Sequence, residues 1–219
     1  MNHKEHYTEN YFKWQGAIGE FGGWANLDKF KDFIKQDFTV VDFGSGGGYL
    51  LKNIKCRQKI GIEINETASK KSNEIGIQSL SSVKSLEDEC ADLIISNNAL
   101  EHTKHPLNEL KELYRILKPN GKIVFVVPCE SISYKYKPND VNYHLHCWSP
   151  MCAGNLFNEA GFNVLESKAY KHKWPRYYDK IANIFGRNIF NTICKLYARW
   201  ETTWFQVRVV AEKKAPNNC

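Results

Sequence analysis

The stretch of sequence that begins at Thr39 constrains the fold more than any other part of the chain. A short apolar run ends in Asp42, four glycines follow between Gly44 and Gly48, and an apolar segment suited to a helix begins at Tyr49. Strand, glycine-rich turn and helix in this order open a nucleotide-binding α/β domain. Glycine allows positive φ angles and a close approach of the backbone to a ligand. The stretch therefore predicts an α/β fold with a ligand at the turn.

The spacing of these glycines separates two kinds of nucleotide site. Dinucleotide-binding turns read G-x-G-x-x-G and direct a helix N-terminus at a pyrophosphate. This chain reads D-x-G-x-G-x-G, and Asp42 would repel an anion but attract an ammonium or sulfonium group. Asp42–Gly48 resembles the first motif of class I S-adenosylmethionine-dependent methyltransferases. A second expected strand ends at Glu63, whose carboxylate can accept hydrogen bonds from both ribose hydroxyls. The alternative for Glu63 is an ordinary solvated glutamate.

The resemblance continues through residues 39–162. The segment Leu100-Glu101-His102 is similar to the "LEH" segment of the small-molecule branch of the family, the type 11/12-like methyltransferases. The resemblance implies a doubly wound, Rossmann-like seven-stranded sheet of order 3-2-1-4-5-7-6 with an antiparallel last strand. Strands are expected near residues 39–43, 60–64, 77–81, 91–97, 121–128, 162–170 and 202–212. Between them we expect helices over 107–117 and 150–160, with Ser149 capping the second, and a turn at 119–121.

The same resemblance implies S-adenosylmethionine as the cofactor. The residues that would bind it are Asp42, Gly44, Ser45, Gly46, Glu63, Ile64, Ser82, Val83 and Asn97. One position departs from the family, because the third strand usually ends in an Asp that holds the adenine amino group, and Ser82 stands there instead. A serine hydroxyl accepts a hydrogen bond more weakly than a carboxylate does. Backbone groups at Ser82 and Val83 are the alternative adenine contacts.

Histidines are the candidate acceptor-side residues, because a histidine pKa lies near neutrality and an alcohol acceptor benefits from a general base. We predict catalytic roles for His102, His144 and His146. The alternative for His102 is the structural role that "LEH" histidines often have. A metal site built from His144, His146, Cys147 and Cys152 is the rival interpretation. No second cluster of ligands pairs with them in the sequence, so no metal is expected.

Three regions follow from the pattern. Residues 1–38 are expected to form an aromatic-rich helical cap, and residues 39–219 the cofactor-binding domain, including a helical insertion at 171–200. Glycines among the aromatic residues of 14–25 make a poor plain helix, so this stretch either folds over the cofactor or packs on the sheet. The insertion is expected to be amphipathic and broken near Gly186. It could serve as packing or a lid, as a homodimer contact, or as a membrane-surface helix.

Charge and composition narrow the possible partners. The chain of 219 residues has a net charge of +6, and residues 168–219 alone carry eleven Lys/Arg against three Asp/Glu. This basic segment could attract an anionic small molecule, with Lys171, Lys173 and Arg176 as a clamp, or be a solvated helix surface. Without a recognition module, nucleic acid is not an expected partner. The start lacks a signal peptide and no apolar run could span a membrane.

The predicted function is therefore transfer of a methyl group from S-adenosylmethionine to an oxygen of a polar small molecule. A phosphorylated or sugar-linked metabolite, such as a cell-surface glycan precursor, fits the basic segment and the histidines. Seven cysteines without a C-x-x-C pair indicate reduced thiols and a cytoplasmic protein, and membrane association is not expected. The alternatives are a quinone or lipid methyltransferase and a regulatory protein that binds S-adenosylmethionine without catalysis.

Overall fold

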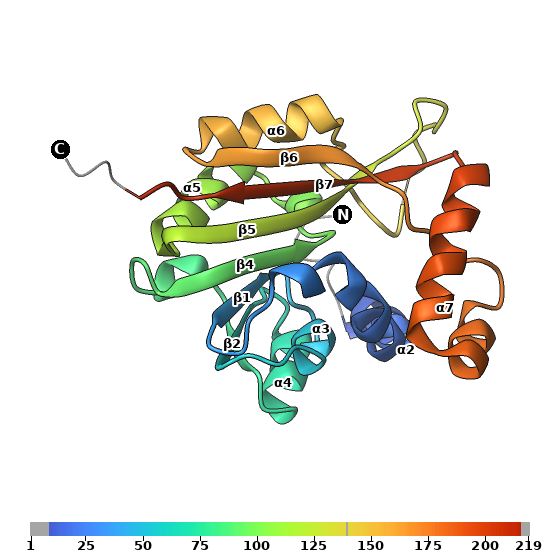
Figure 1. Ribbon diagram of the computed structural model, residues 1–219, viewed down its shortest axis with the longest axis horizontal. Coiled ribbons are helices and arrows are strands. Elements are labelled where there is room, and N and C mark those ends of the chain that lie inside the picture. The colour runs from blue at the N-terminus through green and yellow to red at the C-terminus, as the bar shows by residue number, and fades with distance from the viewer. Residues whose placement is uncertain (1–8, 139, 216–219) are drawn as a thin grey trace.

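The fold is organised around one seven-stranded sheet, seen in the computed structural model, which describes residues 9–138 and 140–215 (Figure 1). Residues 1–8 and 216–219, at the two ends of the predicted domains, lie outside the described residues. The strand order is β3-β2-β1-β4-β5-β7-β6, with β7 antiparallel to both neighbours, which confirms the predicted topology. The strands are β1 Thr39–Phe43, β2 Gln58–Ile62, β3 Gln78–Leu80, β4 Ala91–Asn97, β5 Leu117–Cys129, β6 Asn163–Tyr170 and β7 Phe205–Glu212.

Helices lie on both faces of the sheet. The α-helices are α2 Glu9–Asn26, α3 Tyr49–Lys52, α4 Glu66–Glu74, α5 Pro106–Ile116, α6 Pro150–Glu159 and α7 Tyr178–Trp200. Four short 3₁₀ turns are η1 Leu27–Lys29, η2 Lys31–Phe33, η3 Val83–Ser85 and η4 Leu100–His102. The predicted cap of α6 is present, because the Ser149 side chain accepts a hydrogen bond from the amide of Cys152.

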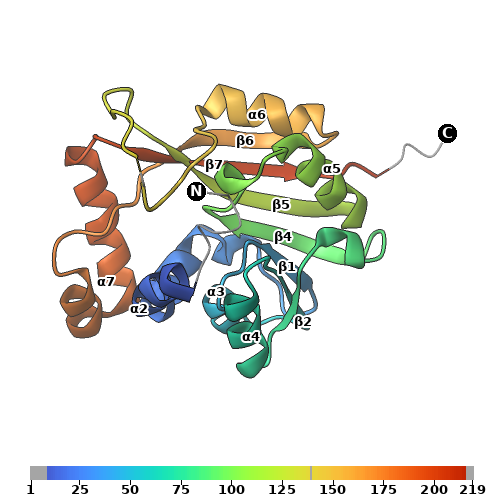
Figure 2. The same ribbon diagram turned by 180° about the vertical axis from the view of Figure 1, so that it is seen from behind.

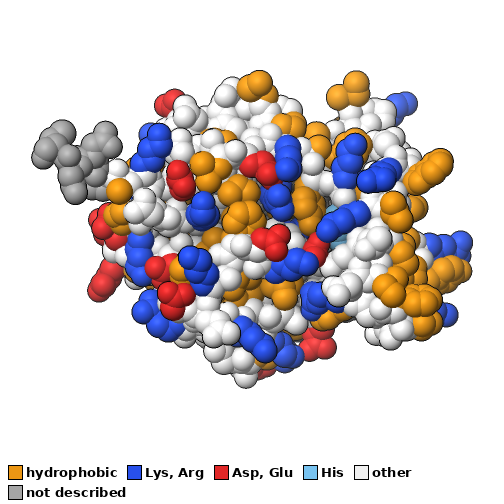
Figure 3. Space-filling model, in the orientation of Figure 1, with side chains coloured by type: hydrophobic (Ala, Val, Ile, Leu, Met, Phe, Trp, Pro, Cys, Tyr) orange, Lys and Arg blue, Asp and Glu red, His pale blue; other side chains and the backbone are white. Residues whose placement is uncertain are grey.

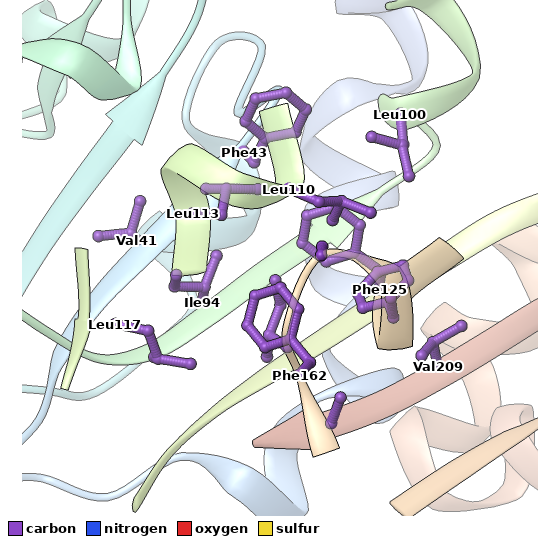
Figure 4. Packing of buried hydrophobic residues seen from close by; sticks show 14 of the residues in the cluster. Val41, Phe43, Ile94, Leu100, Leu110, Leu113, Leu117, Phe125, Phe162 and Val209 are labelled. Atoms are coloured by element: carbon purple, nitrogen blue, oxygen red, sulfur yellow. The ribbon is translucent and has the colours of Figure 1, made fainter. Parts of the chain in front are cut away.

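Successive side chains of the central strands point to opposite faces of the sheet, so the core has two layers. All of β1 is buried, as expected for a parallel strand covered on both faces. Val41 and Phe43 point to the face covered by α5 and α6, where they join Leu110 and Phe125 (Figure 4). Val40 points to the opposite face, which packs against α3 and the 3₁₀ turns of the cap. The strand edge that carries the glycine turn is thus held rigidly between two apolar layers.

The predicted turn at residues 119–121 takes a different form in the structure. Strand β5 already begins at Leu117, and its pairing with β4 is interrupted by a register shift between Ala91 and Leu93. Asn120 adopts a left-handed φ of 63° and donates its amide to the carbonyl of Lys213. The turn signal therefore becomes a bulge inside a long strand, because neighbouring strands on both sides provide hydrogen-bond partners.

The glycine-rich cap forms a continuous helix, contrary to the expectation that these residues make a poor one. A side chain on Gly23 would collide with the main chain of Tyr49, the first residue of α3, and one on Gly19 would collide with the Tyr49 ring. The glycines therefore let α2 approach α3 closely, and this packing offsets their low helix propensity. Figures 1 and 2 both show α2 between α3 and α7.

The insertion between β6 and β7 packs against the cap. Helix α7 has a break at Gly186, as predicted, where φ is 72°. Phe190 of α7 is fully buried, and its ring lies 5.6 Å from that of Phe21 and 5.5 Å from that of Trp24. The opposite side of α7 carries exposed apolar residues among basic ones (Figure 3). Within the described part of the chain, none of the helices has the length and apolarity needed to cross a membrane.

Candidate active site

The glycine turn is fixed against β2 by its own backbone. The amides of Gly44 and Ser45 both donate to the carbonyl of Ile62, at 2.9 and 3.1 Å. Gly44 has a φ of 75°, and a Cβ there would overlap the Cβ of Ala99, which follows β4. The position needs glycine both for its conformation and for its close neighbour. The turn thus lies at the carboxyl edge of the sheet, where open α/β sheets bind ligands.

Glu63 ties this turn to the end of β2. Its two carboxylate oxygens accept hydrogen bonds from the amides of Gly46 and Asn65, each at 2.8 Å. Burial raises the pKa of Glu63, and the backbone hydrogen bonds oppose that rise. Asp42 is 2% exposed, and burial together with the nearby charge of Glu63 raises its pKa well above the usual range. Two carboxyl groups therefore lie in a site of low polarity, an environment that favours a cationic ligand.

Two adjacent hollows lie at this edge. The smaller, about 370 Å³, lies beside the end of β2, and we call it the β2 cavity. The larger, about 540 Å³, lies under α2 and the start of the insertion, and we call it the cap cavity. Both are lined by Gly44, Gly46, Asn98 and His102. The shared residues place the two cavities side by side at the carboxyl edge of the sheet.

All nine residues predicted to bind the cofactor line one of these cavities. The β2 cavity is lined by Gly44, Gly46, Glu63, Ile64, Ser82 and Val83. The cap cavity is lined by Asp42, Gly44, Ser45, Gly46 and Asn97. The Ser82 hydroxyl accepts a hydrogen bond from the amide of Lys84 at 3.2 Å. This bond occupies one of the positions at which the hydroxyl oxygen could accept a hydrogen bond from the adenine amino group. The contacts of all nine residues with the cofactor remain predictions.

The three predicted catalytic histidines separate into a pair and an outlier. His102 and His144 both line the cap cavity, with ring centroids 5.0 Å apart. His144 Nδ1 lies 2.5 Å from Oε1 of Glu130, which also lines this cavity. His146 lines neither cavity; its Nε2 lies 3.0 Å from the carbonyl oxygen of Thr103, and its ring stacks on Trp148. The structure thus brings two of the three histidines to the cap cavity.

Glu101 lies beneath the histidine pair. Glu101 is fully buried, and its Oε1 lies 3.9 Å from His102 Nε2 and 4.0 Å from His144 Nε2. Burial raises the pKa of Glu101 to about 8. The main-chain carbonyl of the same residue accepts hydrogen bonds from the amides of Leu145 and His146. Glu101 therefore both anchors the loop that carries His144 and places a carboxyl group against the two imidazoles.

A buried lysine connects the cap to the strand ends. Lys29 is 4% exposed and donates to Oδ1 of Asn97 at 2.7 Å and to Oε1 of Gln206 at 2.9 Å. Gln206 in turn donates to Oδ1 of Asn98 at 3.1 Å. Burial lowers the pKa of Lys29 to about 7. No sequence pattern points to Lys29 or Gln206, because their hydrogen bonds join distant parts of the chain.

The cap cavity is acidic rather than basic. Among its described lining residues, the charged side chains are Asp42 and Glu130, and none is Lys or Arg. Lys173, expected to clamp an anion, is buried and forms an ion pair with Glu201. Arg176 is exposed and lies over the ring of Tyr177. Aromatic residues outside the predicted site complete the lining, namely Tyr49, Tyr134, Trp174, Trp204 and Phe205.

Comparison with curated proteins gives two relatives, each matched over part of its length. The chain is 30% identical over 104 residues to a malonyl-[acyl-carrier protein] O-methyltransferase of Marinomonas sp. (strain MWYL1). It is 31% identical over 111 residues to an uncharacterised methyltransferase of Schizosaccharomyces pombe. These matches cover 42% and 47% of this chain, but only 38% and 43% of the two relatives.

Solved structures share the fold over most of the chain. A possible histamine N-methyltransferase from Thermotoga maritima has a TM-score of 0.68 and 20% identity, covering 95% of this chain and 97% of its own. A complex between the Haloferax volcanii Trm112 methyltransferase activator and a putative methyltransferase has a TM-score of 0.69 and 18% identity. The match covers 95% of this chain and 99% of that chain. Geranyl diphosphate C-methyltransferase from Streptomyces coelicolor A3(2) has a TM-score of 0.62 and 14% identity. The match covers 87% of this chain and 77% of that chain.

The family itself is settled by a sequence model. Residues 13–167, more than half of the chain, match the model of the methyltransferase domain. The match includes the glycine turn, the acid at the end of β2 and the histidine pair, and the sheet order agrees with it. The chain therefore belongs to the methyltransferase-domain family, with the class I fold and S-adenosylmethionine as its cofactor.

Proposed function

We propose that the protein transfers the methyl group to a hydroxyl oxygen of a polar small molecule, such as a sugar-linked metabolite. The observation that carries this proposal is the polar cluster of His102, His144 and Glu130 in the wall of the cap cavity. The glycine turn lines the same cavity. A donor bound at the turn and an acceptor at the histidines would therefore meet in the same cavity.

The two cavities suggest how the donor lies. The adenosine part fits the β2 cavity, where Glu63 can accept hydrogen bonds from the ribose hydroxyls and Val83 offers an apolar surface. The methionine part, with its sulfonium, then extends past Gly44 into the cap cavity, towards Asp42. A positive sulfonium beside a buried carboxyl group favours the ionised form of Asp42. This placement directs the reactive methyl group towards the acceptor space.

Methyl transfer from a sulfonium is an in-line displacement, so the protein mainly aligns donor and acceptor and excludes water. A hydroxyl acceptor must also lose its proton, and we assign this activation to the histidine pair that lines the cap cavity. The carboxylates of Asp42 and Glu130, with no cationic side chain among the described lining residues, favour a neutral hydroxyl over a phosphate. The phosphorylated acceptors expected from the basic segment therefore find no support in this cavity.

An amine is the second candidate acceptor. Trp174, Trp204 and Tyr134 line the cap cavity together with Glu130. Aromatic faces and a carboxylate attract ammonium groups. Such an acceptor would bind as a cation and react after losing one proton, so N-methylation would need the same histidine pair as O-methylation.

A screen of acceptors with labelled S-adenosylmethionine tests the proposal, with mass spectrometry locating the new methyl group. Methylation of sugar-type hydroxyls supports it, and methylation confined to amines, quinones or lipids replaces it with that alternative. Calorimetry with the donor runs in parallel. Donor binding without transfer to any acceptor class, by a protein whose Glu63→Ala variant loses that binding, would indicate the regulatory protein.

A further inference from the structure

Three potential metal ligands converge at the histidine pair. The carboxylate of Glu101 and the imidazoles of His102 and His144 place one ligand atom each within 4.8 Å of the others. Glu101 and His102 belong to η4, directly after β4, and His144 belongs to the loop between β5 and α6. The metal site considered from the sequence used only residues within 144–152, namely His144, His146, Cys147 and Cys152. The three-residue cluster joins segments about forty positions apart, which sequence spacing does not reveal.

The orientation of His144 suits a metal ligand. Its Nδ1 lies 2.5 Å from Oε1 of Glu130, so this nitrogen donates its proton to the carboxylate. The lone pair of Nε2 is then available, and Nε2 is the atom that lies 4.0 Å from Oε1 of Glu101. Metal-binding histidines usually donate their other N–H to a carboxylate or carbonyl, which fixes the tautomer and the ring orientation. Glu130 supplies this interaction.

Glu101 provides an independent observation. The residue is fully buried, and neither of its carboxylate oxygens accepts a hydrogen bond from any other residue that the structure describes. A buried polar group without a partner lowers stability unless something satisfies it. A cation between Glu101 and the two imidazoles would satisfy the carboxylate and bind one nitrogen of each imidazole ring. Zinc bonds of about 2.0–2.2 Å in tetrahedral geometry hold ligand atoms roughly 3.4 Å apart. The three ligand atoms, now within 4.8 Å of one another, would therefore approach by at most about 1.4 Å.

We propose that Glu101, His102 and His144 bind one divalent first-row transition ion of the zinc class. Two imidazoles and one carboxylate form a donor set found at catalytic zinc and iron centres, whereas magnesium and calcium prefer oxygen ligands. His102 and His144 line the cap cavity, so the remaining coordination positions would face the acceptor. The chain would then hold the metal at the wall of the space where the acceptor binds.

The chemical role of the ion rests on the proposed function. A bound Lewis acid lowers the pKa of a coordinated hydroxyl, as it does for water. The O–H bond of the acceptor breaks and its proton passes to solvent. The oxygen then forms a bond to the methyl carbon, and the carbon–sulfur bond of the sulfonium breaks, leaving its electron pair on sulfur as a thioether. The histidines would act as ligands in this scheme rather than as general bases.

Metal binding can be measured without any acceptor. The full chain, stripped with a chelator, is titrated with Zn²⁺ by calorimetry, and with Co²⁺ while its visible absorption is recorded. We expect one ion per chain, with micromolar or tighter affinity. Glu101→Gln and His144→Gln should abolish that binding, and Glu130→Ala should weaken it about 10–100-fold, as for loss of a carboxylate that orients a ligand. His146→Gln is the matched control and should bind as the wild type does.

Three results would overturn the site: no Zn²⁺ binding at 100-fold excess, unchanged affinity in folded Glu101→Gln and His144→Gln proteins, or a Co²⁺–thiolate absorption band that Cys147→Ser removes. Circular dichroism shows whether the variants are folded. Failure of the proposed function looks different, because the ion would then bind while no acceptor is methylated. Full transfer by chelator-treated protein would reject the metal's role and leave the O-methyltransferase proposal standing.

Discussion

Glu63 offers the sharpest test of the donor site. Its carboxylate has about four lone-pair sites, and the amides of Gly46 and Asn65 occupy two of them. The remaining sites can accept hydrogen bonds from the ribose hydroxyls. Glu63→Ala removes this charged acceptor, at a total cost of about 1.5–3 kcal/mol of donor binding. The dissociation constant for S-adenosylmethionine should therefore rise by about 10–150-fold. The turn itself should persist, since Gly44 and Ser45 still donate to Ile62.

Calorimetry with S-adenosylmethionine and with its demethylated product measures the change directly. Glu66→Ala is the matched control, because Glu66 is an exposed acid three residues further along that lines neither cavity. Chemical denaturation of each variant shows whether the free energy of unfolding has changed as well. If Glu63→Ala binds the donor within twofold of the wild type, Glu63 does not hold the ribose, and the placement of adenosine in the β2 cavity is wrong.

The remaining predictions concern four other positions. Gly44→Ala should lower the free energy of unfolding by about 1–3 kcal/mol, because Gly44 has positive φ and its Cβ would overlap Ala99; equal denaturation midpoints would contradict this. His144→Gln should lower kcat about 10²–10⁴-fold with donor affinity intact, and a loss below tenfold would remove it from acceptor activation. Burial lowers the pKa of Lys29 to about 7, so between pH 7 and 10 the unfolded chain binds the extra proton. Wild-type stability relative to Lys29→Met should rise with pH by up to about 1.4 kcal/mol per unit, and a flat difference would contradict a neutral lysine. Arg176→Glu should leave the acceptor KM unchanged, since Arg176 lines neither cavity; a large, salt-sensitive rise would restore the clamp.

The position of the glycine turn and the two acids at one edge of the sheet was predictable because it depends on local sequence. Asp42, the glycine turn and Glu63 each follow directly after a strand, and parallel strands bring their carboxyl ends to one edge. Once the strands are identified, the side chains that follow them must gather at that edge. For the same reason His102, which follows β4, was placed correctly at the cavity, and the sheet order followed from the family resemblance.

The acceptor half depends on contacts that sequence patterns do not record. His144 and His146 are two residues apart in a loop without a repeating conformation, so nothing in their spacing shows that only His144 lines the cap cavity. Gly19 and Gly23 lower the helix propensity of α2, and only the close packing against Tyr49 explains why the helix forms. In α2, tertiary contacts overrode the low helix propensity of the glycines. In the loop, tertiary contacts alone decide which histidine lines the cavity.

The buried charges at this edge connect the cap to the chemistry. Lys29 and Glu101 are both buried near the strand ends, where apolar residues of similar size would give a more stable protein. The hydrogen bonds of the Lys29 side chain explain what this residue contributes instead. Lys29, at the end of the cap, binds Asn97 of β4 and Gln206 of β7, and both residues line the cap cavity. Any displacement of the cap would therefore break hydrogen bonds in the wall of the acceptor space. The position of α2 and the shape of that space are coupled, so substitutions at the interface between α2 and α7 should alter acceptor binding before they alter donor binding.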